Sequence, residues 1–241
     1  GGIDSALLLQ VAAGVLGDHA LGVIGDSPSL ARRELKEARQ FAEKLGVRLR
    51  EVKVCEMEDP HYAGNPSNRC YYCKAELYRK LMEIADEEKL AVIANGANVD
   101  DLQDYRPGQQ AADEFRIVSP LRDAGFTKQD IRDLARRLDL VLWDKPASPC
   151  LASRIPYGEA ISSEKLAQIE AAEDYLHSLG IRQLRVRHFG RQAIIETNQA
   201  DFSLLEEHRQ SIHDRFREIG FSEVEKRTFR SGALNDVLKE T

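Results

Sequence analysis

The sequence predicts an α/β fold, in which helices cover both faces of a parallel sheet, followed by a smaller α+β domain. Three observations predict this fold. Residues 1–146 alternate short apolar runs with amphipathic stretches, which is typical of the strands and helices of a parallel sheet. Residues 144–157 contain three prolines and little periodicity, which indicates a loop or a domain boundary. Residues 147–241 then follow the order of a small second domain, to which we assign substrate binding and oligomerisation.

The elements of the first domain follow from the spacing of its apolar residues. The predicted helices span residues 6–16, 29–45, 74–88 and 127–138, and the predicted strands span residues 20–25, 48–54 and 90–94. The helix at 6–16 and the strand at 90–94 are almost entirely apolar, so we expect both to be buried. Gly46 should end one helix, and Thr127, with Asp130 three residues later, should cap another. The opening loop normally follows a buried strand, so we expect an N-terminal strand that this sequence lacks.

The second domain should combine helices with a small sheet. Its predicted helices span residues 163–179 and 204–219, and its predicted strands span residues 183–188, 192–197 and 221–226. Gly180 ends the first helix, and Gly190 marks the turn between the first two strands. This order of elements is typical of a small α+β domain.

Composition and charge exclude several classes of protein. The chain has 241 residues, 42% hydrophobic and 31% charged, so it can bury a core without disulfides. Its formal net charge of −6 argues against a nucleic acid as the main partner. Its longest apolar stretch is far shorter than the roughly 20 residues that span a bilayer. With only four cysteines, we expect a cytoplasmic protein with no membrane partner.

The chain opens with Gly1-Gly2-Ile3-Asp4-Ser5 and runs directly into a helix. Glycines let the backbone approach an anion closely, and the amides at a helix start attract negative charge. Ser5 can donate a hydroxyl hydrogen bond, whereas Asp4 should hold the loop or an ion. The pattern predicts a phosphate-binding loop; a glycine-rich turn that caps the helix is the alternative. It is not a Walker loop, since no Gly-Lys-Ser/Thr follows.

Two further polar stretches follow predicted strands, where open α/β sheets bind their ligands. Residues 25–28 (GDSP) follow one strand, and residues 95–101 (NGANVDD) follow another. Asp100, Asp101 and Asp104 are close enough in sequence to supply oxygen ligands to magnesium. The alternative is an Asx-rich turn that caps a helix.

Cys70 and Cys73 lie in the stretch NRCYYCK, just before a predicted helix. Two thiolates three residues apart can face one metal, and Arg69 and Lys74 would help to keep them deprotonated. Cys150, in the proline-rich loop, would make a third ligand. We interpret the three as holders of an iron–sulfur cluster with one iron open, to which hydrosulfide can bind.

Two alternatives for the cysteines stay open. With His61 as a fourth ligand they would form a structural zinc site, and the chain would be a nucleotide-binding module without sulfur chemistry. In the other alternative, Cys150 is activated by Lys145 and Arg154 and gives up its own sulfur to an activated carboxylate. Cys55 directly follows a predicted strand, and we expect a small buried hydrophobe there.

The opening residues resemble the phosphate loop of the PP-loop ATP pyrophosphatases. Further stretches resemble one family of that superfamily, the LarE family of ATP-dependent sulfur transferases. The matching stretches are GGIDS (1–5), GDSPSLARREL (25–35), RCYYCK (69–74), DDLQDYRPG (100–108), SPLRDAGFTK (119–128), WDKPASPCLASRIPYG (143–158), RVRHFG (185–190) and FRSGALN (229–235). They cover nearly the whole chain in order, so the resemblance is specific.

The resemblance implies an activity. Members of the family adenylate a carboxylate of pyridinium-3,5-biscarboxylic acid mononucleotide with ATP and replace its oxygen by sulfur, on the way to the nickel-pincer nucleotide of lactate racemase. Some members sacrifice the cysteine that matches Cys150, whereas others have two more cysteines and build a [4Fe–4S] cluster. This chain, with Cys70 and Cys73, is similar to the second type. The resemblance also implies a sulfide donor and a homo-oligomer.

The motifs and the resemblance together indicate the site residues. For ATP they are Gly1, Gly2, Asp4, Ser5, Asp26, Ser27, Gly96, Asn98 and Lys74, for magnesium Asp101, and for sulfur transfer Cys70, Cys73 and Cys150. Arg185 and Arg187 lie two apart on a predicted strand and therefore on one face, and with Arg230 they would clamp the substrate's phosphate. An exposed basic strand face is the alternative.

A tRNA-thiolating PP-loop enzyme is the main rival interpretation, because some of these enzymes also use three cysteines. Such an enzyme needs a broad basic surface for phosphates. Residues 181–230 contain ten Lys or Arg and eight Asp or Glu, and an excess of two positive charges is small for binding tRNA. We therefore expect a small-molecule nucleotide as the substrate.

Overall fold

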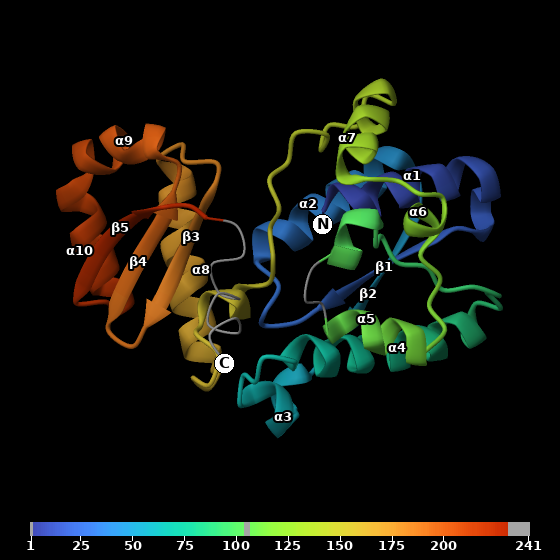
Figure 1. Cartoon of the computed structure of the whole chain (residues 1–241), viewed down its shortest axis with the longest axis horizontal. Coiled ribbons are helices and arrows are strands. Elements are labelled where there is room, and N and C mark those ends of the chain that lie inside the picture. The colour runs from blue at the N-terminus through green and yellow to red at the C-terminus, as the bar shows by residue number, and fades with distance from the viewer. Residues whose placement is uncertain (1, 104–106, 231–241) are drawn as a thin grey trace. The chain divides into compact units, whose positions relative to one another are not determined.

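The computed structural model describes residues 2–103 and 107–230 and divides into two compact units (Figure 1). Unit 1 comprises Gly1–Tyr62 and Asn68–Ser148, and unit 2 comprises Ala63–Ser67 and Pro149–Thr241. Residues 63–67 belong with the second unit, although the predicted boundary lies at residues 146–147. The predictions for Gly1, Asp104 and residues 231–235 lie outside the described residues.

Unit 1 is an α/β unit around a parallel pair of strands. Its helices are α1 (Ile3–Leu16), α2 (Arg32–Leu45), α3 (Pro60–Ala63), α4 (Arg69–Glu87), α5 (Pro107–Glu114), α6 (Pro120–Asp123) and α7 (Lys128–Arg137), with 3₁₀ turns at Gly17–His19, Glu56–Glu58 and Val99–Gln103. Its strands are β1 (Leu21–Asp26) and β2 (Arg48–Lys53), in parallel register from Leu21↔Arg48 to Asp26↔Lys53. The predicted α/β class is confirmed.

Two glycines of β1 show that helices cover both faces of this sheet (Figure 1). A Cβ atom at Gly22 would lie 3.0 Å from Leu9 Cδ2 of α1, and one at Gly25 would lie 3.3 Å from Leu77 Cδ1 of α4. Residues three apart on a strand point to opposite faces, so α1 and α4 pack on opposite sides of β1. A larger residue at either glycine would require the facing leucine side chain to move.

The strand predicted at residues 90–94 is wrong. Among the described residues, only Ala94 of this segment forms a bridge, in parallel with Val118, and Val92 is 62% exposed. An apolar run indicates that a segment suits a strand, but a strand also needs a neighbour with which to pair its backbone. The sequence pattern shows the first property and not the second.

The predicted helices of unit 1 are present, but the sequence predicts their first residues and the burial of their side chains less accurately. α1 is helical as predicted, but Leu7 near its start is fully buried whereas Val15 near its end is 76% exposed. α4 begins at Arg69, five residues before the predicted start, because its first turn is polar and aromatic and lacks the apolar spacing used for the prediction. At α7, Thr127 and Asp130 form a reciprocal capping box, which confirms that prediction.

Unit 2 is an α+β unit. Its helices are α8 (Ser163–Ser178), α9 (Phe202–Glu207) and α10 (Arg209–Ile219), with 3₁₀ turns at Leu151–Arg154 and Gln199–Asp201, and its strands are β3 (Leu184–Phe189), β4 (Gln192–Thr197) and β5 (Glu223–Thr228). β3 and β4 are antiparallel, whereas β4 and β5 are parallel. The single helix predicted over residues 204–219 is two helices, which meet at His208.

The core of unit 2 lies between one face of this sheet and helices α8 and α10. Its most buried side chains include Leu176, Val186, Ile195 and Phe216, each 2% exposed or less. The opposite face of β3 therefore carries Arg185 and Arg187, which flank Val186 along the strand. No helix in the described part of either unit has both the length and the apolar character needed to cross a bilayer.

His188 of β3 is a buried neutral histidine. It is 2% exposed, its Nε2 lies 3.0 Å from Gln168 Oε1, and its Nδ1 has no hydrogen-bond partner among the described residues. Because the amide oxygen of Gln168 can only accept, Nε2 carries the proton and Nδ1 does not. Burial, and then the charge of Lys165, lower the pKa of His188 below its usual value.

We expect unit 2 to lose stability at mildly acidic pH because of His188. Its pKa is lower in the folded state, so the unfolded chain binds the proton first. Stability is then complete above the unfolded pKa of about 6.5 and falls as the pH drops below it. Urea unfolding at about pH 7.5 and about pH 5.5 measures the difference, which should shrink in His188→Gln. An equal difference in that variant would assign the effect to another group.

Candidate functional site

The amino end of α1 has the geometry of a phosphate-binding loop. Gly2 is the N-cap, with φ −84° and ψ 164°, and Ser5 Oγ donates to Gly2 O over 3.1 Å. The first amides of a helix have no intrahelical partners and form its positive dipole end, so this end attracts anions. It lies at the edge of unit 1 toward which β1 points, where α/β sheets bind ligands (Figure 1).

Gly96 lies directly against this loop. A Cβ atom at Gly96 would stand 2.8 Å from Ser5 N and 3.1 Å from the carbonyl carbon of Asp4, which is closer than side chains approach a backbone. Only glycine fits there without moving the first turn of α1. The structure thus brings together two stretches that the sequence analysis assigned separately to ATP.

Asp4 holds a lysine at the loop. Its carboxylate accepts from Lys128 Nζ at 2.5 Å and from Asn98 Nδ2 at 3.3 Å. Asp4 and Asn98 are predicted ATP-site residues, whereas Lys128 was not predicted from the sequence. The available signal was the place of Lys128 as the first residue of a helix within the matching stretch 119–128. A lysine held there brings positive charge to any phosphate that the loop binds.

Lys128→Met should weaken ATP binding by at least roughly tenfold, since a hydrogen bond to a charged group contributes about 1.5–3 kcal/mol. The variant would also leave the carboxylate of Asp4 without its cation beside the phosphates. Calorimetric titration with ATP and magnesium measures the dissociation constant. Lys36→Met, at an exposed position of α2, is the control and should bind as the unchanged protein does. Equal ATP affinity in Lys128→Met would contradict this role.

Residues 95–101 form a turn held by side-chain oxygens. The bonds are Ala97 N to Asn95 Oδ1 (3.0 Å), Asp100 N to Asn98 Oδ1 (3.0 Å), Asn98 N to Asp101 Oδ2 (3.0 Å) and Lys128 N to Asp100 Oδ2 (2.7 Å). The Asx-rich turn is therefore present. In the described parts of the chain, no three Cys, His, Asp or Glu side chains group as metal ligands. The magnesium role of Asp101 stays a prediction.

Arg32 organises the carboxyl end of β1. Its guanidinium binds Asp26 Oδ1 at 2.5 Å, Ser27 O at 2.6 Å and Leu30 O at 2.7 Å. Asp26 and Ser27, both predicted to contact ATP, are therefore held by an arginine that the sequence analysis did not assign. The segment after β1 is therefore a turn stabilised by the hydrogen bonds of Arg32.

Cys70 and Cys73 lie within the first two turns of α4 and not before it. Residues three apart on a helix share one face, and the amino end of a helix attracts the negative charge that thiolates carry. Both cysteines are half-buried. Gly108 of α5 lies against this part of α4, since a Cβ atom there would lie 3.0 Å from Lys74 Cγ and 3.9 Å from Cys70 Cβ. Lys74 Nζ lies 5.9 Å from the centroid of the Tyr78 ring.

Cys150 belongs to unit 2 and is exposed. Arg154, only 3% exposed, donates to Cys150 O and pairs with Glu173 at 2.8 Å. Lys145, in unit 1, pairs with two glutamates of α2 at 2.6 Å each. Both cations pair with carboxylates, and their suggested role in activating the Cys150 thiol stays a prediction. Arg154 also holds the backbone of Cys150.

The candidate zinc ligand His61 and the remaining cysteine, Cys55, have different surroundings. The His61 ring stacks on Tyr72 with ring centroids 5.1 Å apart, and its Nδ1 lies 3.0 Å from Asp59 Oδ1. His61 therefore already has an aromatic neighbour and a carboxylate partner. Cys55 follows β2 and is half-buried, where full burial was expected.

Arg187 lies on the face of β3 opposite the core, as its spacing predicts, and is firmly held there. It is 5% exposed, pairs with Glu196 of β4 at 2.9 Å and donates to Ser153 O at 2.7 Å. Ser153 belongs to the turn that follows Cys150. Arg187 thus connects the sheet to the Cys150 turn within unit 2.

Arg185 shares this face, and no carboxylate among the described residues pairs directly with it. It forms no ion pair or hydrogen bond with the described residues, and its guanidinium lies 4.7 Å from the Phe229 ring. Burial, and then the charges of Arg154 and Arg187, lower the pKa of Arg185 to about 10. A bound anion would stabilise a guanidinium whose charge is disfavoured in this way. Arg230, one residue after Phe229, is exposed.

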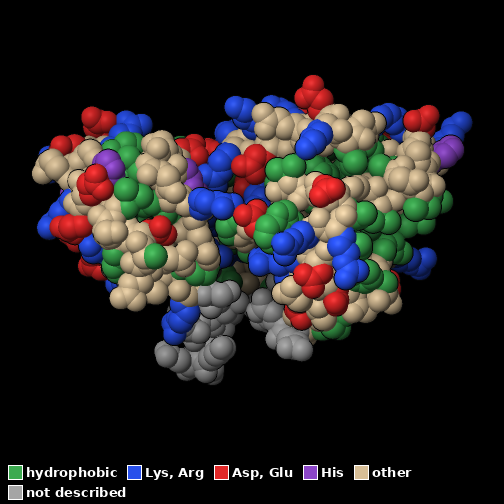
Figure 2. Space-filling model, turned by 90° about the horizontal axis from the view of Figure 1, so that it is seen from above, with side chains coloured by type: hydrophobic (Ala, Val, Ile, Leu, Met, Phe, Trp, Pro, Cys, Tyr) green, Lys and Arg blue, Asp and Glu red, His purple; other side chains and the backbone are tan. Residues whose placement is uncertain are grey.

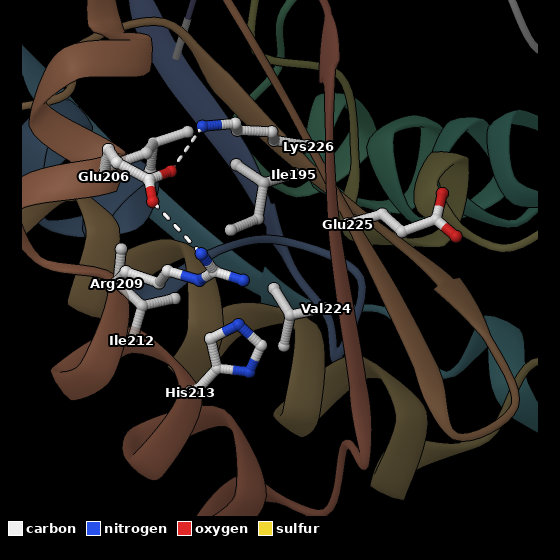
Figure 3. A pocket seen from close by; sticks show the side chains of 9 residues that line it. Ile195, Glu206, Arg209, Ile212, His213, Val224, Glu225 and Lys226 are labelled. Carbon is white, nitrogen blue, oxygen red and sulfur yellow. Dashed lines mark hydrogen bonds and ion pairs between the residues drawn. The ribbon is translucent and has the colours of Figure 1, made fainter.

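A cavity in unit 2 contains none of the predicted site residues. It has a volume of about 270 Å³ and lies between the sheet and helices α9 and α10 (Figure 3). Its lining residues are Ile195, Leu205, Ile212, Val224, Glu206, Arg209, His213, Glu225 and Lys226. Glu206 binds both Lys226, at 2.8 Å, and Arg209, at 3.2 Å, so opposite charges offset each other at the rim.

Acidic and basic side chains are interspersed over the face of the molecule that Figure 2 shows. A protein that grips tRNA presents a continuous basic surface to the phosphates. The small excess of positive charge counted in residues 181–230 is likewise low for such a surface.

Comparisons with known proteins identify relatives along the whole chain. No family model matches. An uncharacterized protein of Synechocystis sp. is 41% identical over 99% of this chain and 90% of its own length. The pyridinium-3,5-bisthiocarboxylic acid mononucleotide synthase of Lactiplantibacillus plantarum is 36% identical over 99% of this chain and 87% of its own length. A more distant relative, the tRNA-specific 2-thiouridylase MnmA of Azorhizobium caulinodans, is 29% identical over 73% of this chain and 55% of its own length.

The extent of these alignments decides the family. The synthase matches across both units, so the likeness is not confined to the phosphate loop that PP-loop proteins share. The thiouridylase matches over a smaller part of both proteins, as a relative within the same superfamily would. The chain therefore belongs to the LarE family of sulfur transferases in the PP-loop superfamily, and it is an enzyme.

Proposed function

We propose that this enzyme converts pyridinium-3,5-biscarboxylic acid mononucleotide to a thiocarboxylate, in the biosynthesis of the nickel-pincer nucleotide of lactate racemase. The observation that carries the proposal is the alignment of 99% of this chain with a pyridinium-3,5-bisthiocarboxylic acid mononucleotide synthase. The phosphate loop of unit 1, the paired cysteines of α4 and the arginines of β3 each supply a part that this reaction needs.

ATP activates the carboxylate for attack by sulfur. A carboxylate oxygen of the substrate attacks the α-phosphorus of ATP, pyrophosphate leaves, and an acyl adenylate forms. Sulfide then attacks the acyl carbon, and AMP leaves with the oxygen through which it was attached. A carboxylate oxygen alone is a poor leaving group, whereas AMP is a good one. The enzyme must hold two anions, ATP and the substrate's phosphate, while this exchange takes place.

The amino end of α1 supports binding of the ATP phosphates. Ser5 supplies a hydroxyl and the helix start supplies amides, while Gly96 leaves the backbone in reach of the phosphates. Lys128, positioned by Asp4, offsets the charge that develops on pyrophosphate as it leaves. Asp101 would hold magnesium at the same edge of unit 1.

The chemistry of their donors fits Cys70, Cys73 and Cys150 to a [4Fe–4S] cluster. The first two thiols share one face at the amino end of α4, and Cys150 is exposed on unit 2. These three thiolates would hold the cluster, which would supply the sulfide for the transfer. Arg154 holds the Cys150 backbone in unit 2, so the protein presents this thiol on a fixed turn.

Arg185, with Arg187 and Arg230, would bind the phosphate of the substrate. Arg185 supports this role best, because its guanidinium has no anionic partner among the described residues and its pKa is lowered to about 10. Arg187 holds its place beside Arg185 through Glu196. A phosphate dianion would offset the repulsion between the arginines on this face.

Mass spectrometry of the substrate tests the proposal. Anaerobically reconstituted protein is incubated with ATP, magnesium, sulfide and the pyridinium dicarboxylate nucleotide. We expect an oxygen-to-sulfur exchange in the nucleotide, with AMP and pyrophosphate formed in step, and iron with acid-labile sulfide in the protein. Sulfur found in tRNA instead, or stoichiometric zinc without iron, would contradict the proposal.

A further inference from the structure

The cavity between the sheet of unit 2 and helices α9 and α10 is a second candidate binding site (Figure 3). All of its lining residues belong to unit 2, and none of them is a predicted site residue. Its volume of about 270 Å³ lies near the lower end of the roughly 300–1,000 Å³ that small-molecule sites occupy. The cavity is therefore large enough for a small organic molecule.

Four aliphatic side chains form the walls of this cavity. They are Ile195 of β4, Leu205 of α9, Ile212 of α10 and Val224 of β5. The first three are 4% exposed or less and belong to the core of unit 2, so the cavity opens into the side of that core. Wall atoms that face open space lack the contacts of a packed interior. An apolar group placed there would gain both contacts and burial.

The charged side chains that line the cavity leave one positive charge in excess. Glu206 accepts from Lys226 at 2.8 Å with one oxygen and from Arg209 at 3.2 Å with the other. The hydrogen bond from Lys226 lowers the pKa of Glu206, so this carboxylate stays ionised and offsets one of the two cations. The side chain of Glu225 points away from the cavity (Figure 3), and its carboxylate accepts from Gln192 at 2.7 Å.

Arg209 keeps one edge of its guanidinium available. Its Nη1 donates to Glu206, whereas its Nε and Nη2 donate no hydrogen bond to the described residues. The same edge of Arg39 binds a carboxylate in unit 1, donating to Glu51 at 2.6 Å from each of these two atoms. His213 lies on the side of Arg209 away from Glu206 (Figure 3) and also has no hydrogen-bond partner in the described part of the chain. A neutral imidazole has one N–H to donate.

We propose that this cavity binds a small organic monocarboxylate with an apolar body, such as a substituted benzoate. The carboxylate accepts from the available edge of Arg209 and from His213, and the apolar body fills the space between Ile212 and Val224. A dianion such as phosphate suits the cavity less well, because it would meet the charge of Glu206 and leave the apolar walls uncovered. The site uses none of the residues proposed for sulfur transfer, so the inference does not rest on the proposed function.

Fluorine NMR with para-(trifluoromethyl)benzoate tests the inference on the full chain. Two further probes divide the ligand into its parts. The matching benzamide has the same apolar body without the charge, and trifluoroacetate has the charge without the ring. We expect the unchanged protein to bind the benzoate at least roughly tenfold more tightly than either of them, because charge-assisted hydrogen bonds and apolar burial both contribute.

Substitutions in unit 2 locate the bound probe. Arg209→Met removes the guanidinium edge and should weaken binding of the benzoate at least roughly tenfold. Arg215→Met, on the same helix but outside the cavity, removes an equal charge and should bind as the unchanged protein does. Val224→Phe should abolish binding, because its ring occupies the cavity from β5.

Several results would overturn the inference. They are the absence of benzoate binding by the unchanged protein, equal affinity for the benzamide, and unchanged affinity in Arg209→Met or Val224→Phe. Circular dichroism checks the fold of each variant, and Val224→Phe decides alone if Arg209→Met does not fold. Binding that weakens as the protein concentration rises would assign the cavity to a second copy of this chain and would also contradict the proposal.

Discussion

Gly96→Ala is expected to reduce acyl-adenylate formation by about two orders of magnitude. The added Cβ would stand 2.8 Å from Ser5 N, so the first turn of α1 must move. A displacement of about 1 Å in a group that positions a reactant costs on the order of 10²-fold in rate. Substrate-dependent release of pyrophosphate measures the effect.

Gly14→Ala in the same helix is the matched control. No heavy atom lies within 4 Å of its Cβ position, so the added methyl group meets open space. This variant should keep full activity and gain up to about 1 kcal/mol of stability, since alanine suits a helix interior better than glycine. Unchanged pyrophosphate release in Gly96→Ala would show that the phosphates bind elsewhere.

Cys73→Ser is expected to lower sulfur transfer below roughly one hundredth of the unchanged rate, because a cluster with three protein ligands cannot spare one. The variant should still bind ATP, since Cys73 lies on α4 and the phosphate loop on α1. The measurement is thiocarboxylate formed over several turnovers under anaerobic conditions, together with the iron content of the protein.

Cys55→Ser is the control for Cys73→Ser, because Cys55 follows β2 and is not an expected ligand. It should keep both iron and activity. The variant Cys73→Ser also separates the two readings of Cys150. If Cys150 gave up its own sulfur, Cys73→Ser would still form one product per chain and leave dehydroalanine at position 150. That result would contradict the cluster.

Local features of the fold could be predicted from the sequence because neighbouring residues cause them. The capping box joins Thr127 and Asp130, three positions apart, and the stop at Gly46 depends on one left-handed glycine with φ 68°. The segment at 90–94 failed as a strand because pairing depends on a partner that its own sequence does not specify.

Only part of the site could be predicted, because local motifs are visible in the sequence and long-range contacts are not. Asp4 was assigned from a local motif, but its partner Lys128 lies 124 positions away, and no local pattern connects the two. Lys145 and Arg154 were assigned to Cys150 because they lie near it in sequence, yet each pairs with carboxylates from distant helices. Charges in a folded chain are offset by spatial neighbours, which the sequence order does not show.

The division of the chain has an evolutionary consequence. Unit 2 takes residues 63–67 from within the sequence of unit 1, so neither unit is one continuous stretch. A recombination event that exchanged residues 149–241 alone would leave the original residues 63–67 in place. The new residues 149–241 would then have to pack against a segment from another protein. New specificity in this architecture is therefore expected to arise by point substitution within unit 2 and not by exchange of a module.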